Sequence, residues 1–153
     1  MADLLERVHP AGWPRGRGYS NGMLTRGEGE RVLFIAGQVG WETDGTFASD
    51  DVADQLVKAL DNVLAVVTAA GGDARSIARI TVYVTDLVAY RRATRRIGEA
   101  WRARLGDHYP AMALVGVAGL VEPKALVEIE ATCVLAARVT ATATATAPAQ
   151  EAR

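Results

Sequence analysis

The stretch of sequence that decides the fold is Ala125-Leu126-Val127-Glu128-Ile129-Glu130-Ala131-Thr132-Cys133-Val134. Its side chains alternate with a period of two, and the stretch is rich in β-branched residues, which predicts a β-strand. We expect one face of this strand to lie in the protein core. That face carries Val127, Ile129, Ala131 and Cys133.

The opposite face of the same strand carries two carboxylates, Glu128 and Glu130. Residues two apart on a strand point the same way and lie roughly 6–7 Å from each other. Leu126 and Val134 bracket them on that face, and a face open to water would not need apolar residues at both ends. We therefore expect this second face to be covered as well, with the carboxylates in or beside a covered site.

The composition of the chain limits the classes of protein to which it can belong. The chain has 153 residues and a formal net charge of −1, and 50% of its residues are hydrophobic. These values are typical of one globular domain with no general attraction to nucleic acid or membrane. No apolar run has the length of a signal peptide or a membrane span. The single cysteine, Cys133, falls on the core face of the strand, which fits either a reducing compartment or an inert buried thiol. We expect a cytoplasmic protein.

Working outward, the periodicity predicts strands at residues 19–25, 31–38, 76–85, 110–118 and 125–135. Apolar residues with helical spacing predict helices at residues 50–70 and 87–105. Ser49 or Asp50 is the expected cap of the first helix, and Gly71-Gly72 ends it. The order β-β-α-β-α-β-β predicts an α+β fold with two layers.

The chain divides into three parts. Residues 1–18 are rich in Gly, Pro and Arg and are expected to be irregular, and residues 19–136 form the folded domain. Within residues 137–153, residues 140–146 alternate Thr and Ala and residues 148–153 are mostly small or polar. These residues have little to bury, so we expect a disordered tail over 137–153.

Two helices can cover only one face of such a sheet. The strands at 31–38 and 110–118 are nevertheless apolar on both faces. Another copy of the chain is the simplest cover for the remaining face, so the sequence predicts a closed symmetric oligomer.

Several short pieces occur in a characteristic order and spacing over residues 16–136. They include Tyr19-Ser20, Val32-Leu-Phe-Ile-Ala-Gly-Gln38, Gln55, Leu60-Asp-Asn-Val63, Ala69-Ala-Gly71, Ile80-Thr-Val-Tyr-Val-Thr-Asp86, Tyr109-Pro-Ala111 and Val127-Glu-Ile-Glu-Ala131. In this arrangement the chain resembles the RidA/YjgF family of reactive-intermediate deaminases. The resemblance implies a chorismate-mutase-like fold, a homotrimer with ligand sites in clefts between subunits, and hydrolysis of enamines or imines such as 2-aminoacrylate to the keto acid and ammonia.

The resemblance also implies roles for individual residues. Glu128 matches the glutamate that positions or activates water. Tyr19 matches a tyrosine of the cleft and is the second expected catalytic residue, because its hydroxyl could polarise a bound imine or carbonyl. Backbone groups of Gly37 and Gln38 are expected to bind the polar end of the substrate. Thr94 matches a position that often holds asparagine in the family.

One position departs from the family pattern. The arginine that binds the substrate carboxylate directly after the Pro-Ala pair is replaced by Met112, whose thioether has no donor. Losing such a charge-assisted pair would weaken carboxylate binding by about 2–5 kcal/mol. We expect a substrate without a free α-carboxylate, or a larger and more apolar one, with Met112 and Trp41 shaping its pocket and Trp13 as a further candidate wall.

Two alternatives remain open at this point. The same clefts could hold a small ligand without catalysis, as in a binding or regulatory protein. The arginine-rich helix at 87–105 could bind or cleave RNA, although we interpret its arginines as a solvated helix face and expect no nucleic-acid partner. The two histidines lack metal-site spacing, so we predict no metal and no cofactor.

Overall fold

The computed structural model describes residues 4–14 and 18–137 and has the predicted α+β architecture. Most of the predicted tail at 137–153 lies outside the described residues. The elements in chain order are β1 (Leu5–Val8), β2 (Gly22–Thr25), β3 (Arg31–Val39), α1 (Val52–Ala69), a short 3-10 turn (Ala74–Ser76), β4 (Ile77–Val84), α2 (Leu87–Leu105), β5 (Ala111–Gly116) and β6 (Val127–Leu135).

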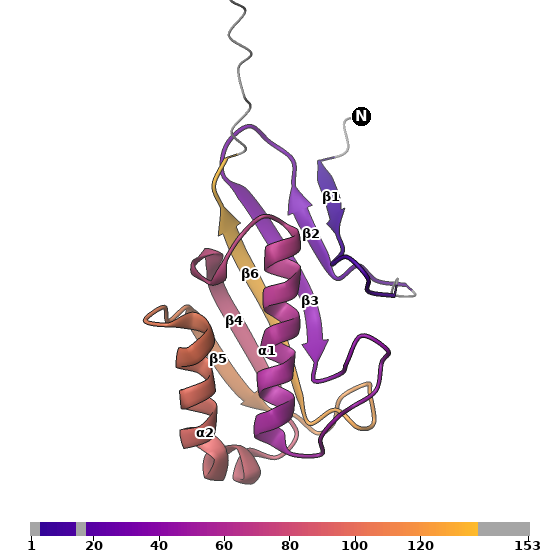
Figure 1. Ribbon diagram of the computed structural model, residues 1–153, viewed down its shortest axis with the longest axis vertical. Helices are drawn as coiled ribbons and strands as arrows, with labels where there is room; N and C mark the ends of the chain where they lie inside the picture. The colour runs from indigo at the N-terminus through magenta and orange to yellow at the C-terminus, as the bar shows by residue number, and fades with distance from the viewer. Residues whose placement is uncertain (1–3, 15–17, 138–153) are drawn as a thin grey trace, which may run out of the picture.

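The strands form one six-stranded sheet in the order β1-β2-β3-β6-β4-β5. Only β4 and β5 run parallel, and the other neighbours are antiparallel. Both helices lie on the same face of the sheet (Figure 1). The pairing of β3 with β6 shifts register between Ile35 and Gln38, and that of β4 with β6 shifts between Ile77 and Arg79.

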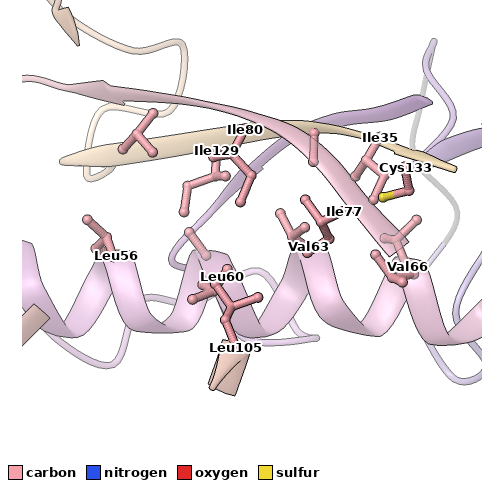
Figure 2. Packing of buried hydrophobic residues seen from close by; sticks show 14 of the residues in the cluster. Ile35, Leu56, Leu60, Val63, Val66, Ile77, Ile80, Leu105, Ile129 and Cys133 are labelled. Atoms are coloured by element: carbon pink, nitrogen blue, oxygen red, sulfur yellow. The ribbon is translucent and has the colours of Figure 1, made fainter. Parts of the chain in front are cut away.

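The predicted core face of β6 is confirmed. Val127, Ile129 and Cys133 have no exposed surface, and Ala131 is buried beside them. Figure 2 shows Leu56, Leu60, Val63 and Val66 of α1 pointing at Ile129, Cys133 and their neighbours on the sheet. Full burial of a side chain of this size contributes about 1.5–3 kcal/mol. Burial also raises the pKa of the Cys133 thiol to about 12, which leaves it protonated and chemically inert at neutral pH.

The two main helices end much as their sequences predict. Helix α2 has the predicted bounds, and Gly71, with φ of 82°, follows the C-terminus of α1. The predicted cap of α1 at Ser49 or Asp50 is wrong by one or two residues. The carboxylate of Asp51 accepts hydrogen bonds from the N–H groups of Ala53 at 2.9 Å and Asp54 at 3.1 Å. The Ser49 hydroxyl instead accepts the N–H of Asp51 at 3.1 Å and so supports the cap.

The N-terminal segment is not wholly irregular, contrary to the prediction for residues 1–18. Leu5–Val8 forms β1, which pairs antiparallel with β2 from Leu5 opposite Thr25 to Val8 opposite Gly22. Four residues carry too little alternation to predict a strand. These residues become a strand because their backbone groups pair with the otherwise free edge of β2. That pairing depends on the tertiary structure and not on the local sequence.

The sheet face opposite the helices is open in the single chain. It exposes large apolar side chains, including Phe34 at 51%, Val134 at 43% and Val115 at 42% of their surface. Monomeric proteins rarely leave contiguous apolar surface of this kind uncovered. We refer to this surface as the open face.

Candidate functional site

Glu128 lies on the open face of β6. Its backbone is paired with Val39 of β3 on one side and with Tyr83 of β4 on the other. The irregular pairing of β3 brings Gly37 directly against the Glu128 carboxylate, where a Cβ at position 37 would overlap the carboxylate atoms. Glycine is therefore required for Glu128 to adopt this position.

The electrostatic setting makes Glu128 a better base than an ordinary glutamate. Partial burial raises the pKa of Glu128 above its usual value, and the nearby charge of Glu130 raises it further. The Tyr83 hydroxyl donates a hydrogen bond to Glu130 Oε1 at 3.0 Å. Glu128 makes no hydrogen bond through its side chain within residues 4–14 and 18–137. Glu130 is thus engaged by a neighbour, whereas Glu128 is left available for a ligand or water.

Gln38 does not present its side chain to the open face. It is only 1% exposed, and its Nε2 donates to the Ala36 carbonyl at 2.9 Å. That bond closes the irregular turn of β3 on which Gly37 sits. Only the backbone groups at Gly37 and Gln38 could contact a ligand, and this predicted role stays a prediction.

Tyr19 and Trp41 line a second location, a pocket of about 140 Å³ that also includes Trp13. Buried Asn62 of α1 fixes one wall of this pocket, because its Nδ2 donates to the carbonyls of Val39 at 3.0 Å and Trp41 at 2.9 Å. The predicted grouping of Tyr19 with the two tryptophans is present. Neither Glu128 nor Gly37 lines this pocket.

Met112 and Thr94 line a third location, a pocket of about 270 Å³ between α2 and β5, which we call the α2–β5 pocket. Met112 pairs with Ile80 of β4, so it points to the helix side of the sheet. The lining residues are mostly apolar or aromatic: Leu56, Val82, Tyr90, Thr94, Ile97, Gly98, Trp101, Arg102, Tyr109, Pro110, Met112 and Leu114.

Ion pairs to α1 hold α2 in place over this pocket. Arg96 Nη2 donates to Asp54 Oδ1 at 2.6 Å near the N-terminal end of α1. Arg104 donates to both carboxylate oxygens of Asp61, from Nε to Oδ1 and from Nη2 to Oδ2, the latter at 2.9 Å. Bidentate arginine pairs of this kind add geometric precision as well as energy.

The residues predicted to form one site therefore separate within a single chain. Within one chain the sheet lies between Met112, on the helix side, and Glu128, on the open face. The predicted cleft lies between subunits, so the meeting of these two residues across it stays a prediction. Alternation along one strand predicts which residues share a face. It does not predict how the faces of different strands align, because that depends on the irregular pairings of β3 and β4.

Sequence reasoning gave Gln55 and Asn62 only as pieces of the family pattern and missed that their buried side chains position these locations. Gln55 of α1 donates to the carbonyls of Ser49 and Lys124, both at 2.9 Å, and accepts the N–H of Leu126 at 2.8 Å. It thereby fixes the loop that leads into β6, as Asn62 fixes the loop after β3. Polar residues on the buried stripe of α1 were the available signal, since such residues are hydrogen-bonded in folded proteins.

The described residues were also searched for metal sites and for membrane-spanning helices. Between residues 4 and 14 and between 18 and 137, no group of three or more His, Cys, Asp or Glu side chains could hold a metal ion. In the same ranges, no helix has the length and apolar character needed to cross a membrane.

Comparisons with known proteins agree with this architecture. A family model described as Endoribonuclease L-PSP matches residues 16–135. The human 2-iminobutanoate/2-iminopropanoate deaminase is 30% identical over 138 residues, covering 88% of this chain and 93% of that protein. A RutC family protein of Pyrococcus horikoshii is 34% identical over 101 residues, covering 65% of this chain and 75% of that protein.

Solved structures show the same fold. The crystal structure of Escherichia coli TdcF with bound serine superposes with a TM-score of 0.70 at 28% identity, covering 84% of this chain and 98% of that one. With the family model matched over nearly all of the described domain, the chain belongs to the RidA/YjgF family, the family of the Endoribonuclease L-PSP model.

Proposed function

We propose that this protein hydrolyses an imine or enamine of a small carbonyl compound that carries an apolar substituent, with Glu128 as the acid/base group. The observation that carries the proposal is the Glu128 carboxylate. It is partly buried beside Gly37, its pKa is raised, and it makes no side-chain hydrogen bond within the described parts of the chain. The relationship to a protein named as an iminobutanoate and iminopropanoate deaminase supports the same reaction class.

The chemistry needs only water and one group that moves protons. The Glu128 carboxylate would take a proton from water as the water oxygen attacks the carbon of the protonated imine, giving a carbinolamine. The protonated carboxyl would then give that proton to the amino nitrogen. As the C–N bond breaks, the carbinolamine hydroxyl would give its proton to the Glu128 carboxylate, and ammonia and the carbonyl compound are released. A carboxyl group whose pKa is raised above its usual value holds the proton more readily between the two steps.

A neighbouring copy of the chain would complete the site. The open face that carries Glu128 exposes Phe34, Val115 and Val134, and their burial against another copy would remove apolar surface from water. In a closed homotrimer the α2–β5 pocket of one copy would meet Glu128 of the next. This arrangement would bring together residues that one chain keeps apart.

The lining of the α2–β5 pocket supports a larger substrate than 2-aminoacrylate. Tyr90, Trp101 and Tyr109 surround Met112 in a volume of about 270 Å³. A flexible, polarizable methionine among aromatic rings favours an apolar substituent. Its thioether offers no hydrogen-bond donor to the carboxylate of 2-aminoacrylate, which is a short and polar acid.

Turnover of imines made in the reaction mixture tests the proposal. An L-amino acid oxidase would generate the imines of alanine, leucine and phenylalanine, and semicarbazide would trap the imine that escapes hydrolysis. We expect the leucine- or phenylalanine-derived imine to be hydrolysed faster with the protein than without it, and the alanine-derived imine much less. Enzymatically generated 2-aminoacrylate should show weak or no acceleration. Robust deamination of 2-aminoacrylate would refute the reading of Met112, and no acceleration with any imine would refute the hydrolase.

Ligand binding without turnover is the second candidate. It is favoured by the absence of any Asp, Glu, His or Cys among the described residues that line the α2–β5 pocket. A thermal-shift screen of metabolites, followed by turnover assays on the compounds that stabilise the protein, separates the two functions. Stabilisation without consumption would support binding alone.

A further inference from the structure

The α2–β5 pocket contains one formally charged side chain among its described lining residues, that of Arg102. The side chain folds back along α2 toward the helix N-terminus. Its Nη1 lies 3.8 Å from the position that a Cβ would take on Gly98. The guanidinium group therefore lies alongside the Gly98 turn, inside the stripe of α2 that runs from Thr94 through Gly98 to Arg102.

Gly98 has no packing reason to be glycine within the chain. Glycine inside a helix costs about 1 kcal/mol relative to alanine. A Cβ at this position would meet only Arg102, at an ordinary contact distance. What the missing side chain provides is open space next to the guanidinium group.

Within the described residues Arg102 has no counter-ion, as is also true of Arg91 and Arg92 on α2, but of these three arginines only Arg102 lines the pocket. Arg95 pairs with Glu99 at 3.6 Å, and Arg96 and Arg104 pair with carboxylates of α1. In the described ranges 4–14 and 18–137, the Arg102 side chain makes no hydrogen bond or ion pair. A fork of five N–H donors beside apolar and aromatic walls matches an anionic group with an apolar body.

We infer that Arg102 binds a substrate carboxylate in the α2–β5 pocket, in place of an arginine at position 112. Tyr90, Trp101 and Tyr109 then hold a ring-sized apolar substituent. The substrate class becomes imines or enamines of larger, apolar 2-oxo acids, whose carboxylate is held by α2 instead of β5. This inference rests on the proposed function only in taking the pocket as the substrate-binding half of the site.

A pair of matched probes tests the charge requirement without any turnover. Calorimetric titration with 3-phenylpropanoate and with its uncharged amide, 3-phenylpropanamide, should show the acid binding about tenfold more tightly or better at low salt. Arg102→Gln should remove that preference, and Arg102→Lys should keep part of it. Arg92→Gln is the matched control, because Arg92 lies exposed on the same helix and does not line the pocket.

Gly98→Leu gives a second, independent readout. The added side chain would fill the space beside the guanidinium group and should weaken both probes together. Circular dichroism and the melting temperature would show that each variant is folded. Equal binding of acid and amide by the wild type, survival of the preference in Arg102→Gln, or no binding of either probe at millimolar concentration would overturn the inference.

The two proposals fail separately. If Arg102→Gln keeps the acid preference while Glu128→Gln abolishes imine hydrolysis, the hydrolase stands and the role of Arg102 falls. If the acid binds through Arg102 but no imine is hydrolysed, the binding role stands and the hydrolase falls. Where turnover is measurable, Arg102→Gln should raise KM for acidic substrates more than it lowers kcat.

Discussion

Met112 and Glu128 lie on opposite faces of the same sheet. Met112 pairs with Ile80 on the face that the helices cover, whereas Glu128 stands beside Tyr83 on the open face. One chain therefore holds the α2–β5 pocket and the proposed acid/base group on opposite sides of its sheet. In the proposed assembly a second copy packed on the open face would let them act together, so the open face is the first target for mutation.

Phe34→Asp should break the assembly. Phe34 is 51% exposed in the single chain, and a charge there could not be buried against another copy without a partner. Size-exclusion chromatography with light scattering should show a smaller species than the wild type. Val121→Asp is the control, because Val121 is 95% exposed in the loop before β6. An unchanged mass for Phe34→Asp would mean that the open face is not the interface.

Gly37→Ala should disable the candidate base without touching the pocket. A Cβ at Gly37 would overlap the Glu128 carboxylate, which must then move. Displacing a reacting group by about 1 Å can cost on the order of 100-fold in rate, so we expect kcat/KM for imine hydrolysis to fall about 10- to 100-fold. Gly119→Ala is the matched control, because nothing lies within 4 Å of a Cβ there. Equal activities of the two variants would count against the placement of Glu128.

Glu128→Gln should abolish hydrolysis and change how stability depends on pH. The pKa of Glu128 is raised above 4.5 in the folded protein, so the folded state holds its proton more tightly than the unfolded state. The resulting stabilisation is fully present below about pH 4.5 and is lost as pH rises through the folded pKa. Glutamine does not titrate, so the variant should gain stability relative to the wild type over that range. We expect a gain below about 1 kcal/mol, because water still screens the side chain.

Urea unfolding at pH 4 and at pH 7 measures this effect. The difference in unfolding free energy between Glu128→Gln and the wild type should favour the variant more at pH 7 than at pH 4. Glu122→Gln, on an exposed loop, controls for the loss of one negative charge. Unchanged turnover in Glu128→Gln would remove this residue from the mechanism.

Asn62→Ala should destabilise the fold around Trp41. The substitution leaves the carbonyls of Val39 and Trp41 without their donor, and unsatisfied buried polar groups cost about 1–3 kcal/mol each. The Trp41 carbonyl is only part-buried, so water can replace its donor, and chemical denaturation should show a loss of about 1–3 kcal/mol that comes mostly from Val39. Thr68→Ala at an exposed position of the same helix should change stability by less than about 0.5 kcal/mol. Similar effects of both substitutions would mean that Asn62 does not anchor the loop.

The sequence predicted what depends on local periodicity. The inward and outward faces of β6 and the bounds of α2 follow directly from spacings of two and 3.6 residues. Strand β1 could not be predicted, because its four residues are ordered by pairing with β2. The cap at Asp51 was missed because three adjacent residues, Ser49, Asp50 and Asp51, all have capping side chains, and only the backbone path selects one.

The candidate site was harder to predict than the fold. The position of Met112 relative to Glu128 depends on the parallel pairing of β5 with β4 and on register shifts in two strands. Neither leaves a periodic signal in the sequence. Arg102 is exposed, as the sequence predicts for the arginines of α2, and it also lines the pocket, which the sequence does not predict. A long side chain can fold back over a glycine one turn away, and helical spacing alone does not show this.

Native mass spectrometry of the wild-type protein at micromolar concentration tests the central claim, that neighbouring copies cover the open face and complete the site. We predict one dominant species with three times the 16.2 kDa mass of the chain. A stable monomer under these conditions would contradict the account, because Glu128 and the α2–β5 pocket would then remain on opposite sides of a single sheet.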